Sequence, residues 1–419
     1  MRQIFIFLVM AMQLSSGIFT SLVDARERGH AGGNFIPHLR THPVHLAYTI
    51  GPFVKYAKWE NGQVTDRQLV DNTNYAKGFL DLKKDDDDQV YLAYAINRNI
   101  YNTHWFIMFK DFQTGTLETL PVTSPCIPLG VSLQVQGTGA QKEFLITVAL
   151  QNLSLPNNVQ QVHLFRKHIG AQNWNSTILF SNYQQSIALQ PHLNTALDQQ
   201  GLLHVFFSQK QINAQAVSVH ELEYDLNQRG VLGNYTVSTA NGLNLQGTAD
   251  RFDPLDGEMS SNEAYAAFSA NPSLIGAKRD LTAPLKMWQF LNNFPQALGV
   301  DMEIYQHTSD DYMALAAVEN GQFTKGGTDL NFYFSAQKKI QWNRVSIEQG
   351  KTYYSPSLSI PTTFPTENIF LACTAEESPF LSTLYLYTHA PYDLTIWGSV
   401  VIDQDLNLTP EINHVQIVQ

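Results

Sequence analysis

A short apolar segment recurs along this chain, and its recurrence limits the possible folds more than any other feature. The copies are VHLAYT from Val44, VYLAYA from Val90, FLITVA from Phe144, LHVFFS from Leu203, AYAAFS from Ala264, YMALAAV from Tyr312 and IFLACT from Ile369. Their spacing is irregular but stays near roughly 40–50 residues plus a loop, a period typical of repeat architectures. The chain therefore repeats one supersecondary unit seven times.

The neighbours of this segment recur as well. An alternating segment that often contains proline or glycine precedes it, as in AKGFLDL, QPHLNTAL and GVDMEIY. An aromatic-rich strand follows, as in HWFIMFK and VHELEYD, and LKMWQFL is the expected third strand of the fifth copy. A fourth segment, such as GTLETLP or TIWGSVV, usually comes after a turn but is hard to find in the fifth copy. Each copy thus predicts a four-stranded antiparallel meander, with little helical periodicity.

Four-stranded sheets that are apolar on both faces must stack on one another, and radial stacking produces a β-propeller. We therefore predict an all-β chain whose residues 32–419 form a single propeller domain of seven four-stranded blades. Six or eight blades, a β-sandwich pair and an irregular β-solenoid are the alternatives. The stretch HAGGNFIPHLRTHP is expected to give the first blade its inner strand. The tail HVQIVQ would complete the first blade or cap the last one.

The first 25 residues have the layout of a secretory signal peptide. Arg2 precedes an apolar run from Ile4 to Met12, and small residues then lead to a cleavage position after Ala25, with Gly17 as the competing position. A membrane anchor is disfavoured, because the run is shorter than the roughly 20 apolar residues that a spanning helix needs. We therefore expect a secreted, periplasmic or extracellular protein.

The charge content limits the partners. Charged residues make up 15% of the chain, and the formal net charge is -11 without any basic run. Nucleic acid and anionic membrane surfaces are therefore not expected as partners. Carbohydrate or an extracellular protein is expected instead. The two cysteines, Cys126 and Cys373, are too few for a disulfide scaffold, and Cys373 is expected to be a small core residue.

A binding site is expected on the loops that connect strand two to strand three and each blade to the next, because in propellers these loops share one face. They are long and rich in Asn, Gln and Tyr, which suits hydrogen bonding to sugar hydroxyls and stacking on sugar rings. Amide-rich loops that only confer solubility are the alternative. The candidate ligand-binding residues are Asn97, Arg98, Tyr101, His104, Asp250, Arg251, Asp253, Lys278 and Arg279.

No metal or other cofactor is expected. His38 and His192 both follow proline, but they belong to different blades and have no carboxylate at ligand spacing. The four aspartates Asp85–Asp88 are expected to form a solvated turn between the first two strands of the second blade. Calcium remains the alternative at this turn and at the Asp250, Asp253, Asp256 cluster.

The stretch PHLNTALDQQGLLHVFFSQ combines a proline, an apolar strand, D-x-x-G and a second apolar strand. In this repeat the chain resembles sialidase-type propellers, which implies a propeller fold. The Ser-x-Asp-x-Gly-x-x-Trp box of that family is absent, and its three channel arginines cannot be placed. The resemblance thus covers the repeat and identifies no site.

No catalytic motif is matched, which favours an exported, lectin-like binding propeller over an enzyme. Such a protein would recognise carbohydrate or a surface protein through loops on one face. One alternative is a propeller-fold glycan hydrolase or lyase, with carboxylates from DRFDPLDGE and a facing blade. The other is a secreted interaction scaffold with no small ligand.

Overall fold

The computed structural model describes most of the chain from residue 42 onward. The described residues are 42–419 except 73–74, 98–103, 123, 157–158, 185, 212–215, 242–254, 270–272, 284–285, 296, 308–309, 323–325, 336–341, 362–367, 379–380, 391–392 and 407–411. They belong to one compact unit, Pro37–Gln419. The segment predicted to be a signal peptide lies outside the described residues. Within the described part, no helix has the length and apolar character needed to cross a membrane.

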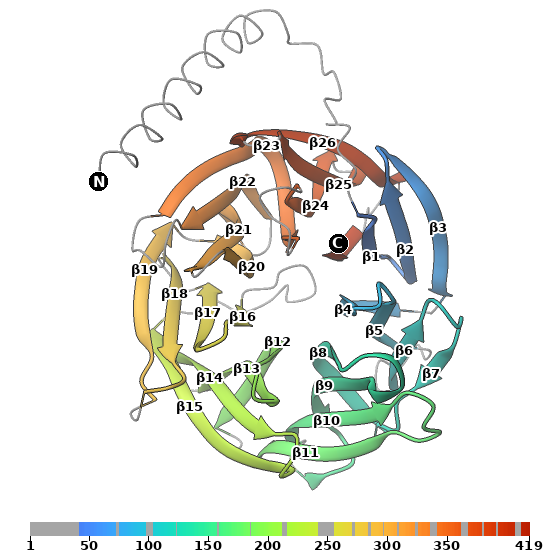
Figure 1. The fold of residues 1–419 in the computed structure, drawn as a ribbon, viewed down its shortest axis with the longest axis vertical. Helices are drawn as coiled ribbons and strands as arrows, with labels where there is room; N and C mark the ends of the chain where they lie inside the picture. The colour runs from blue at the N-terminus through green and yellow to red at the C-terminus, as the bar shows by residue number, and fades with distance from the viewer. Residues whose placement is uncertain are drawn as a thin grey trace, which may run out of the picture. The chain divides into compact units, whose positions relative to one another are not determined.

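The unit is built from antiparallel four-stranded sheets arranged around a central axis (Figure 1). The first sheet, from the inside outward, is β27 (Ile412–Val418), β1 (Val44–Ile50), β2 (Phe53–Glu60) and β3 (Gln63–Asn72). The second is β4 (Tyr75–Lys84), β5 (Val90–Asn97), β6 (Trp105–Asp111) and β7 (Leu117–Thr119).

The next three sheets repeat this order. The third blade is β8 (Cys126–Gln136), β9 (Glu143–Asn152), β10 (Gln160–His168) and β11 (Asn175–Asn182), with the short 3-10 helix η1 (Gly139–Gln141) between its first two strands. The fourth is β12 (Ile187–Leu197), β13 (Leu202–Gln211), β14 (Ala216–Asp225) and β15 (Gly230–Asn241). The fifth is β16 (Leu255–Met259), β17 (Glu263–Ser269), β18 (Ser273–Asp280) and β19 (Gln289–Pro295).

The sixth and seventh blades share one long strand, so their hydrogen bonds form a continuous seven-stranded sheet. The sixth blade is β20 (Ala297–His307), β21 (Asp310–Gln322), β22 (Gly326–Ser335) and the first part of β23 (Trp342–Ser359). The seventh is the last part of β23, then β24 (Phe370–Ser378), β25 (Leu381–Ala390) and β26 (Asp393–Leu406). Because β23 serves as the outer strand of one blade and then as the inner strand of the next, the blades number seven.

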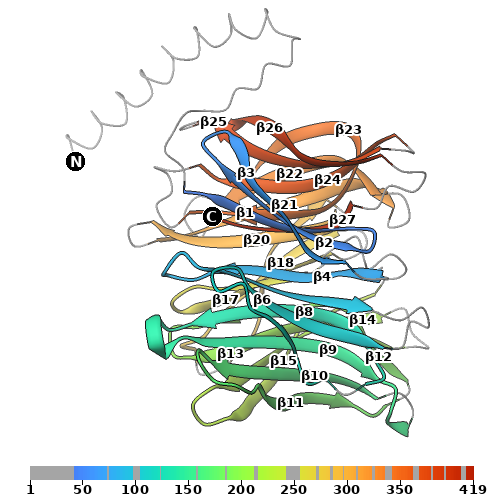
Figure 2. The same ribbon diagram turned by 90° about the vertical axis from the view of Figure 1, so that its right-hand side faces the viewer.

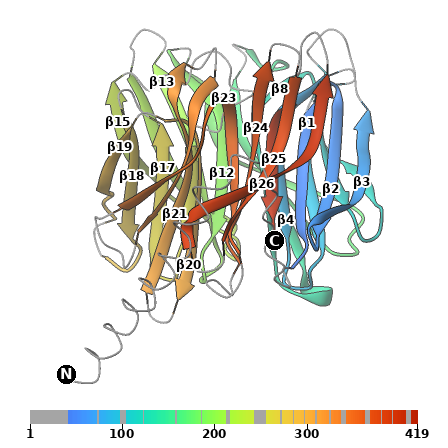
Figure 3. The same cartoon turned by 90° about the horizontal axis from the view of Figure 1, so that it is seen from above.

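The seven inner strands close a ring. Neighbouring pairs in contact are β27 with β4, β4 with β8, β8 with β12, β12 with β16, β16 with β20, β20 with β23, and β23 with β27. Figures 2 and 3, turned by 90° from Figure 1, show the strands running across the thickness of this ring, with connections on both faces. The predicted seven-bladed propeller is therefore confirmed.

The repeated apolar segment forms the second strand of every blade, as predicted. All residues of β1 and β5 are buried, because each blade packs against a neighbour on both faces. Apolar clusters fill successive gaps between blades, and between the seventh blade and the first the rings of Phe370 and Trp59 lie 5.3 Å apart. Cys373 belongs to one of these clusters, which confirms it as a core residue, and both cysteines are free and buried.

Two strand predictions are wrong. The inner strand of the first blade is the C-terminal strand β27, which pairs with β1, so the stretch HAGGNFIPHLRTHP does not take that position. The tail therefore completes the first blade, one of the two placements expected for it. In the fifth blade the third strand is β18, and the expected strand LKMWQFL supplies part of the outer strand β19 instead. The sequence SLIGAKRD resembles a loop because it has few apolar residues and ends in three charged residues.

Candidate functional site

The centre of the ring holds a cavity of about 70 Å³ that residues from all seven inner strands line. A buried water molecule needs a cavity of roughly 10–15 Å³, so this cavity has room for several water-sized groups. Its volume is about half that of a cavity that takes benzene, so a ligand would insert an end group rather than a whole ring. The charged and polar residues among its walls are therefore the candidate site.

One position of each inner strand carries a polar residue between two residues that are mostly apolar. These inner-ring residues are Asp81, Ser132, Asn194, Asp256, Asp301, Ser357 and Gln416. Many of them bond to the next inner strand. Asp81 Oδ2 accepts hydrogen bonds from the Leu133 backbone N–H at 2.7 Å and from the Ser132 hydroxyl at 3.0 Å, and that hydroxyl lies 2.7 Å from the Thr195 hydroxyl.

The same pattern continues around the ring. The side-chain amide of Asn194 donates to Asp256, whose Oδ2 also accepts the Met302 backbone N–H at 2.6 Å. The Leu358 N–H donates to Asp301, and the Ile417 N–H donates to the Ser357 hydroxyl at 3.2 Å. These polar residues thus have a structural role, because they satisfy backbone groups and tie adjacent blades together.

A second set of charged residues lies two positions further along three of these strands. Lys83, Glu258 and Glu303 line the cavity together with the aspartates of the inner ring. Side chains two residues apart on a strand share a face, so each of these strands presents two charges to the cavity. Lys83 Nζ lies 3.9 Å from Asp81 Oδ1. The walls thus combine five carboxyl groups with one ammonium group among the described residues.

Burial keeps part of this cluster protonated. Burial, together with the negative charge of Asp256 and against the attraction of Lys83, raises the pKa of Glu303 to about 8. Burial also raises the pKa of Glu258 well above its ordinary value, and the charges of Glu303 and Asp256 add to the effect. For Lys83, burial opposes the charge, yet the carboxylates around it, Asp81 first, raise its pKa. Protonated carboxyl groups donate hydrogen bonds and ionised ones accept them, so the cavity offers both roles near neutral pH.

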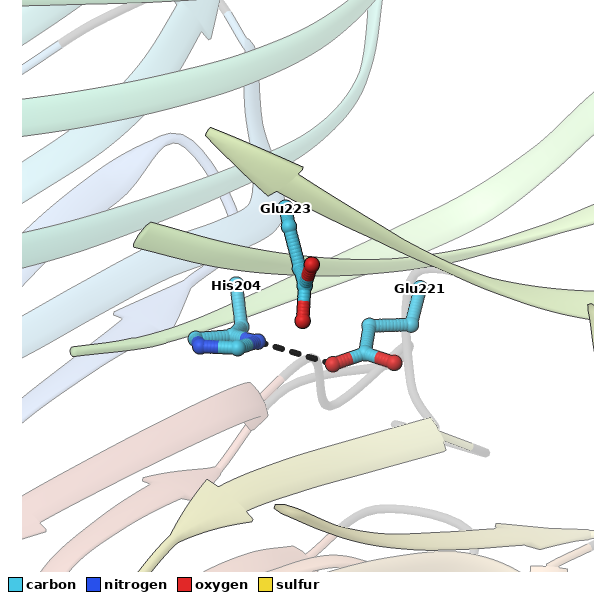
Figure 4. Close-up of side chains that lie close together, drawn as sticks. All are labelled: His204, Glu221 and Glu223. Atoms are coloured by element: carbon cyan, nitrogen blue, oxygen red, sulfur yellow. Dashed lines mark hydrogen bonds and ion pairs between the residues drawn. The ribbon is translucent and has the colours of Figure 1, made fainter. Parts of the chain in front are cut away.

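A second cluster of titratable residues has the composition of a metal site. His204 on β13 and Glu221 and Glu223 on β14 are buried, and their ligand atoms lie within 4.8 Å of one another (Figure 4). His204 Nδ1 lies 2.7 Å from Glu221 Oε1, the pair joined by the dashed line in Figure 4. Imidazole and carboxylate ligands of this kind suit several divalent cations.

Cationic side chains already occupy the position that a metal would take. Arg279 Nη2 lies 2.5 Å from Glu221 Oε1 and 2.6 Å from Glu223 Oε1, and Lys286 Nζ lies 2.5 Å from Glu223 Oε2. The Asp198 carboxylate lies 3.4 Å from His204 Nε2. These residues form a charge-compensated network that links the fourth and fifth blades, and we call it the Arg279 network.

The turn formed by Asp85–Asp88 lies between β4 and β5, as predicted, but it is only partly solvated. Asp85 Oδ1 accepts the backbone N–H groups of Asp87 and Gln89, at 2.8 and 2.9 Å. The buried Lys142 of the third blade forms ion pairs with Asp85 and, at 3.2 Å, with Asp87. Its ammonium group thus fixes this acidic turn against the next blade.

Five of the nine predicted ligand-binding residues lie outside the described residues: Arg98, Tyr101, Asp250, Arg251 and Asp253. Two others end up in different environments. Asn97 is the last residue of β5 and is only 1% exposed, whereas His104 is exposed and forms an isolated bridge to Cys126. Asn97 was predicted in a surface loop, but it is buried at the end of a strand.

Lys278 and Arg279 were predicted on a binding loop, and this placement is wrong. Both belong to β18, where Lys278 Nζ lies 2.7 Å from Glu263 Oε1. Arg279 has no exposed surface and is held in the network described above. Its guanidinium also lies over the ring of Tyr235, 4.6 Å from the centroid. The side chain is thus committed to the contact between blades rather than to a ligand.

The cavity residues Asp81, Lys83, Glu258, Asp301 and Glu303 were not predicted as a site. A signal for them is present in the sequence, since the inner strands read LDLK, LDGE and VDME. Each places an aspartate two residues before a second charged residue, inside a strand that is otherwise apolar. These residues come together only when the ring closes, and no local sequence pattern predicts which inner strands meet there.

The comparisons with known proteins agree with the fold. No family model and no curated protein matches the chain. A variant of an ACO/RPE65 chimera aligns with a TM-score of 0.52 and 9% identity, over 92% of this chain and 94% of that one. The WD40 domain of SCAP from fission yeast gives 0.45 at 8% identity, over 90% of each chain. The Trypanosoma rangeli sialidase gives 0.46 at 10% identity, over 82% of this chain and 56% of its own length.

At these identities the likeness concerns the fold alone. The chain is a seven-bladed β-propeller, and its neighbours in structure include WD40 and sialidase propellers.

Proposed function

We propose that this propeller is a binding protein whose central cavity takes the hydroxyl-bearing end of a carbohydrate. The observation that carries the proposal is the convergence of five carboxyl groups and Lys83 on one small cavity at the ring axis. Carboxylates accept hydrogen bonds from sugar hydroxyls, while a lysine ammonium and a protonated carboxyl donate to them. Residues on rigid strands hold such groups more firmly than loops do.

The first test is a glycan array probed with the purified protein. Retention of a related set of intact sugars is expected, together with loss of that retention in the Glu258→Gln and Glu303→Gln variants. Lys286→Ala is the matched control, because Lys286 lies in the Arg279 network and not in the cavity wall. If both glutamate variants still retain the sugars, the binding site lies outside the cavity. If the protein retains no sugar on the array, the carbohydrate proposal is wrong. An extracellular protein partner would then be sought by pull-down.

Glycan hydrolysis is the second candidate function. Carboxyl groups with a raised pKa serve as general acids, and Glu303 has a pKa of about 8. A catalytic pair would combine Glu303 with a second carboxyl group of the cavity wall, such as Asp256 or Glu258. Mass spectrometry of each spot after incubation decides, because only an enzyme changes the mass of the spotted glycan.

Export of the protein is a further part of the proposal, and it rests on the sequence alone. The segment from Arg2 to Ala25 combines a positive charge, an apolar run and small residues. Expression of the full chain followed by mass spectrometry of the mature N-terminus tests it. A terminus that follows Ala25 or Gly17 supports export, whereas an intact terminus in the cell fraction contradicts it.

A further inference from the structure

Toward one face of the ring, the described wall of the cavity includes a contact between two aromatic side chains. Phe79 on β4 and His192 on β12 both line the cavity, and their rings meet edge to face with centroids 5.7 Å apart. They belong to the second and fourth blades, so they meet across β8, the inner strand of the blade between them. Phe79 is 4% exposed and His192 is 5% exposed. We call this pair the aromatic floor.

Bulges in the two inner strands bring the floor residues to the axis. Between Ala76 and Leu80 the inner strand β4 advances by four residues while its partner β5 advances by two. Between Leu189 and Leu193 the strand β12 advances by four residues while β13 advances by two. Bulges of this kind change the direction of side chains and are frequent beside binding sites. Each floor residue is the last one of its bulge.

The backbone around the floor leaves little room for movement. His192 has a φ of 77°, in the left-handed region, which a residue other than glycine keeps only where its surroundings hold it there. Gly130 on β8 lies under the contact, and a Cβ atom at this position would lie 2.9 Å from Leu193 Cβ. Only glycine allows β8 and β12 to approach so closely. The floor is therefore a fixed part of the fold.

The other side of the cavity is polar and accessible. Lys83, Glu258 and Glu303 lie two positions beyond the inner ring along their strands. The side chain of Lys83 is 31% exposed, and both glutamates are partly exposed. The inner strands run toward the turns that connect the first and second strands of each blade, such as Asp85–Asp88. These three charged residues therefore lie nearer to the face that carries those turns, which we call the turn face.

We propose that the cavity is a blind socket, which a ligand enters from the turn face and in which the aromatic floor is the stop. The inference rests on the proposed function, because the entering group is the hydroxyl-bearing end of a carbohydrate. The end group passes Lys83 and the two glutamates first and meets the inner-ring aspartates next. A socket closed at one end accepts the terminal sugar of a glycan and excludes an internal one. The turn face is opposite to the loops on which the sequence predicted a site.

Carboxyl labelling of the unaltered protein tests the direction of entry without any sugar. A carbodiimide couples an amine to accessible carboxyl groups, and mass spectrometry measures each residue with a small amine, glycinamide, and with a bulky one, tryptophanamide. The ratio between the two amines cancels the intrinsic reactivity of each carboxyl group. Glu258 and Glu303 should keep a larger share of their labelling with the bulky amine than Asp256 and Asp301 do. An equal share or the reverse order would overturn the socket.

A substitution at the mouth sharpens the test. Gln134 on β8 is partly exposed and lies two positions beyond Ser132, toward the turn face. Gln134→Trp should therefore reduce labelling of Glu258 and Glu303 by the bulky amine. Gln68→Trp, on the outer strand β3, is the matched control and should leave this labelling unchanged. If Gln134→Trp also leaves it unchanged, entry from the turn face is wrong. The comparison within the unaltered protein decides the question even if a variant does not fold.

The glycan array separates this inference from the proposed function. Retention of glycans that share a terminal sugar, reduced in Gln134→Trp and kept in Gln68→Trp, supports both. If labelling gives the expected order but the array retains no sugar, the socket stands and the carbohydrate proposal is wrong. If sugars are retained equally by the unaltered protein and by Gln134→Trp, the carbohydrate proposal stands and entry from the turn face is wrong.

Discussion

The central cavity and the Arg279 network contain the same kinds of side chain but balance their charges differently. In the network, Arg279 and Lys286 pair with Glu221 and Glu223 at 2.5–2.6 Å. In the cavity, five carboxyl groups line the walls together with Lys83, whose Nζ lies 3.9 Å from Asp81 Oδ1. In the network, ion pairs neutralise the buried charges. In the cavity, protonation neutralises some of the carboxyl groups.

The difference separates a structural role from a functional one. A compensated buried network joins two blades and leaves little capacity for a ligand. Carboxyl groups that are only partly compensated, and that face a cavity instead of a guanidinium, can exchange their hydrogen-bond partners. Perturbed proton affinity in a cavity is a common mark of a functional site, although structural networks perturb it too. Substitutions in each cluster should therefore have effects of different size and sign.

Removal of the central cation of the network is expected to have the largest effect. Arg279→Met leaves Glu221 and Glu223 buried with only Lys286 and His204 as basic partners, and should lower the free energy of unfolding by about 3–5 kcal/mol. Chemical denaturation measures it. The neighbouring Lys278→Met is the control, with an expected loss under about 1 kcal/mol, because Lys278 is part-exposed. Equal losses in the two variants would mean that the network is not held by Arg279.

Neutralisation of a cavity carboxyl group is expected to have a smaller effect and the opposite sign. The folded-state pKa of Glu303 is about 8, so the unaltered protein loses stability as pH rises from the ordinary carboxyl range through about 8. Glu303→Gln cannot ionise and should be more stable than the unaltered protein at pH 9, by on the order of 1 kcal/mol, with little difference at pH 5. Thermal unfolding at the two pH values measures this. A loss of stability at pH 9 would show that the Glu303 carboxylate is fully compensated.

The outer cation of the network is expected to matter least. Lys286 is 33% exposed at its side chain, so water screens its contact with Glu223. Lys286→Ala should lower the free energy of unfolding by under about 1 kcal/mol in the same denaturation experiment. A loss as large as that of Arg279→Met would show that both cations are needed to neutralise the two glutamates. Exposure to water would then not decide how much each cation contributes to stability.

Much of the fold is readable from local patterns. The continuous apolar runs at Val44 and Val90 predict strands packed on both faces, and such strands require neighbouring sheets on each side. The fifth blade was the exception, since β18 ends in Lys278, Arg279 and Asp280 and so resembles a polar loop. Only the Glu221 and Glu223 carboxylates of the fourth blade explain a buried arginine there.

The sequence by itself determined the repeat, the four-stranded meander of most blades and the number of blades, because these depend on residues close together in the chain. The tertiary structure alone decided which charges meet. Asp256 and Met302, whose contact ties the fifth blade to the sixth, are 46 residues apart, and Arg279 and Glu221 are 58 apart. The inner-strand aspartates become a cluster only when β27 closes the ring, since closure brings seven strands from the whole length of the chain to one axis.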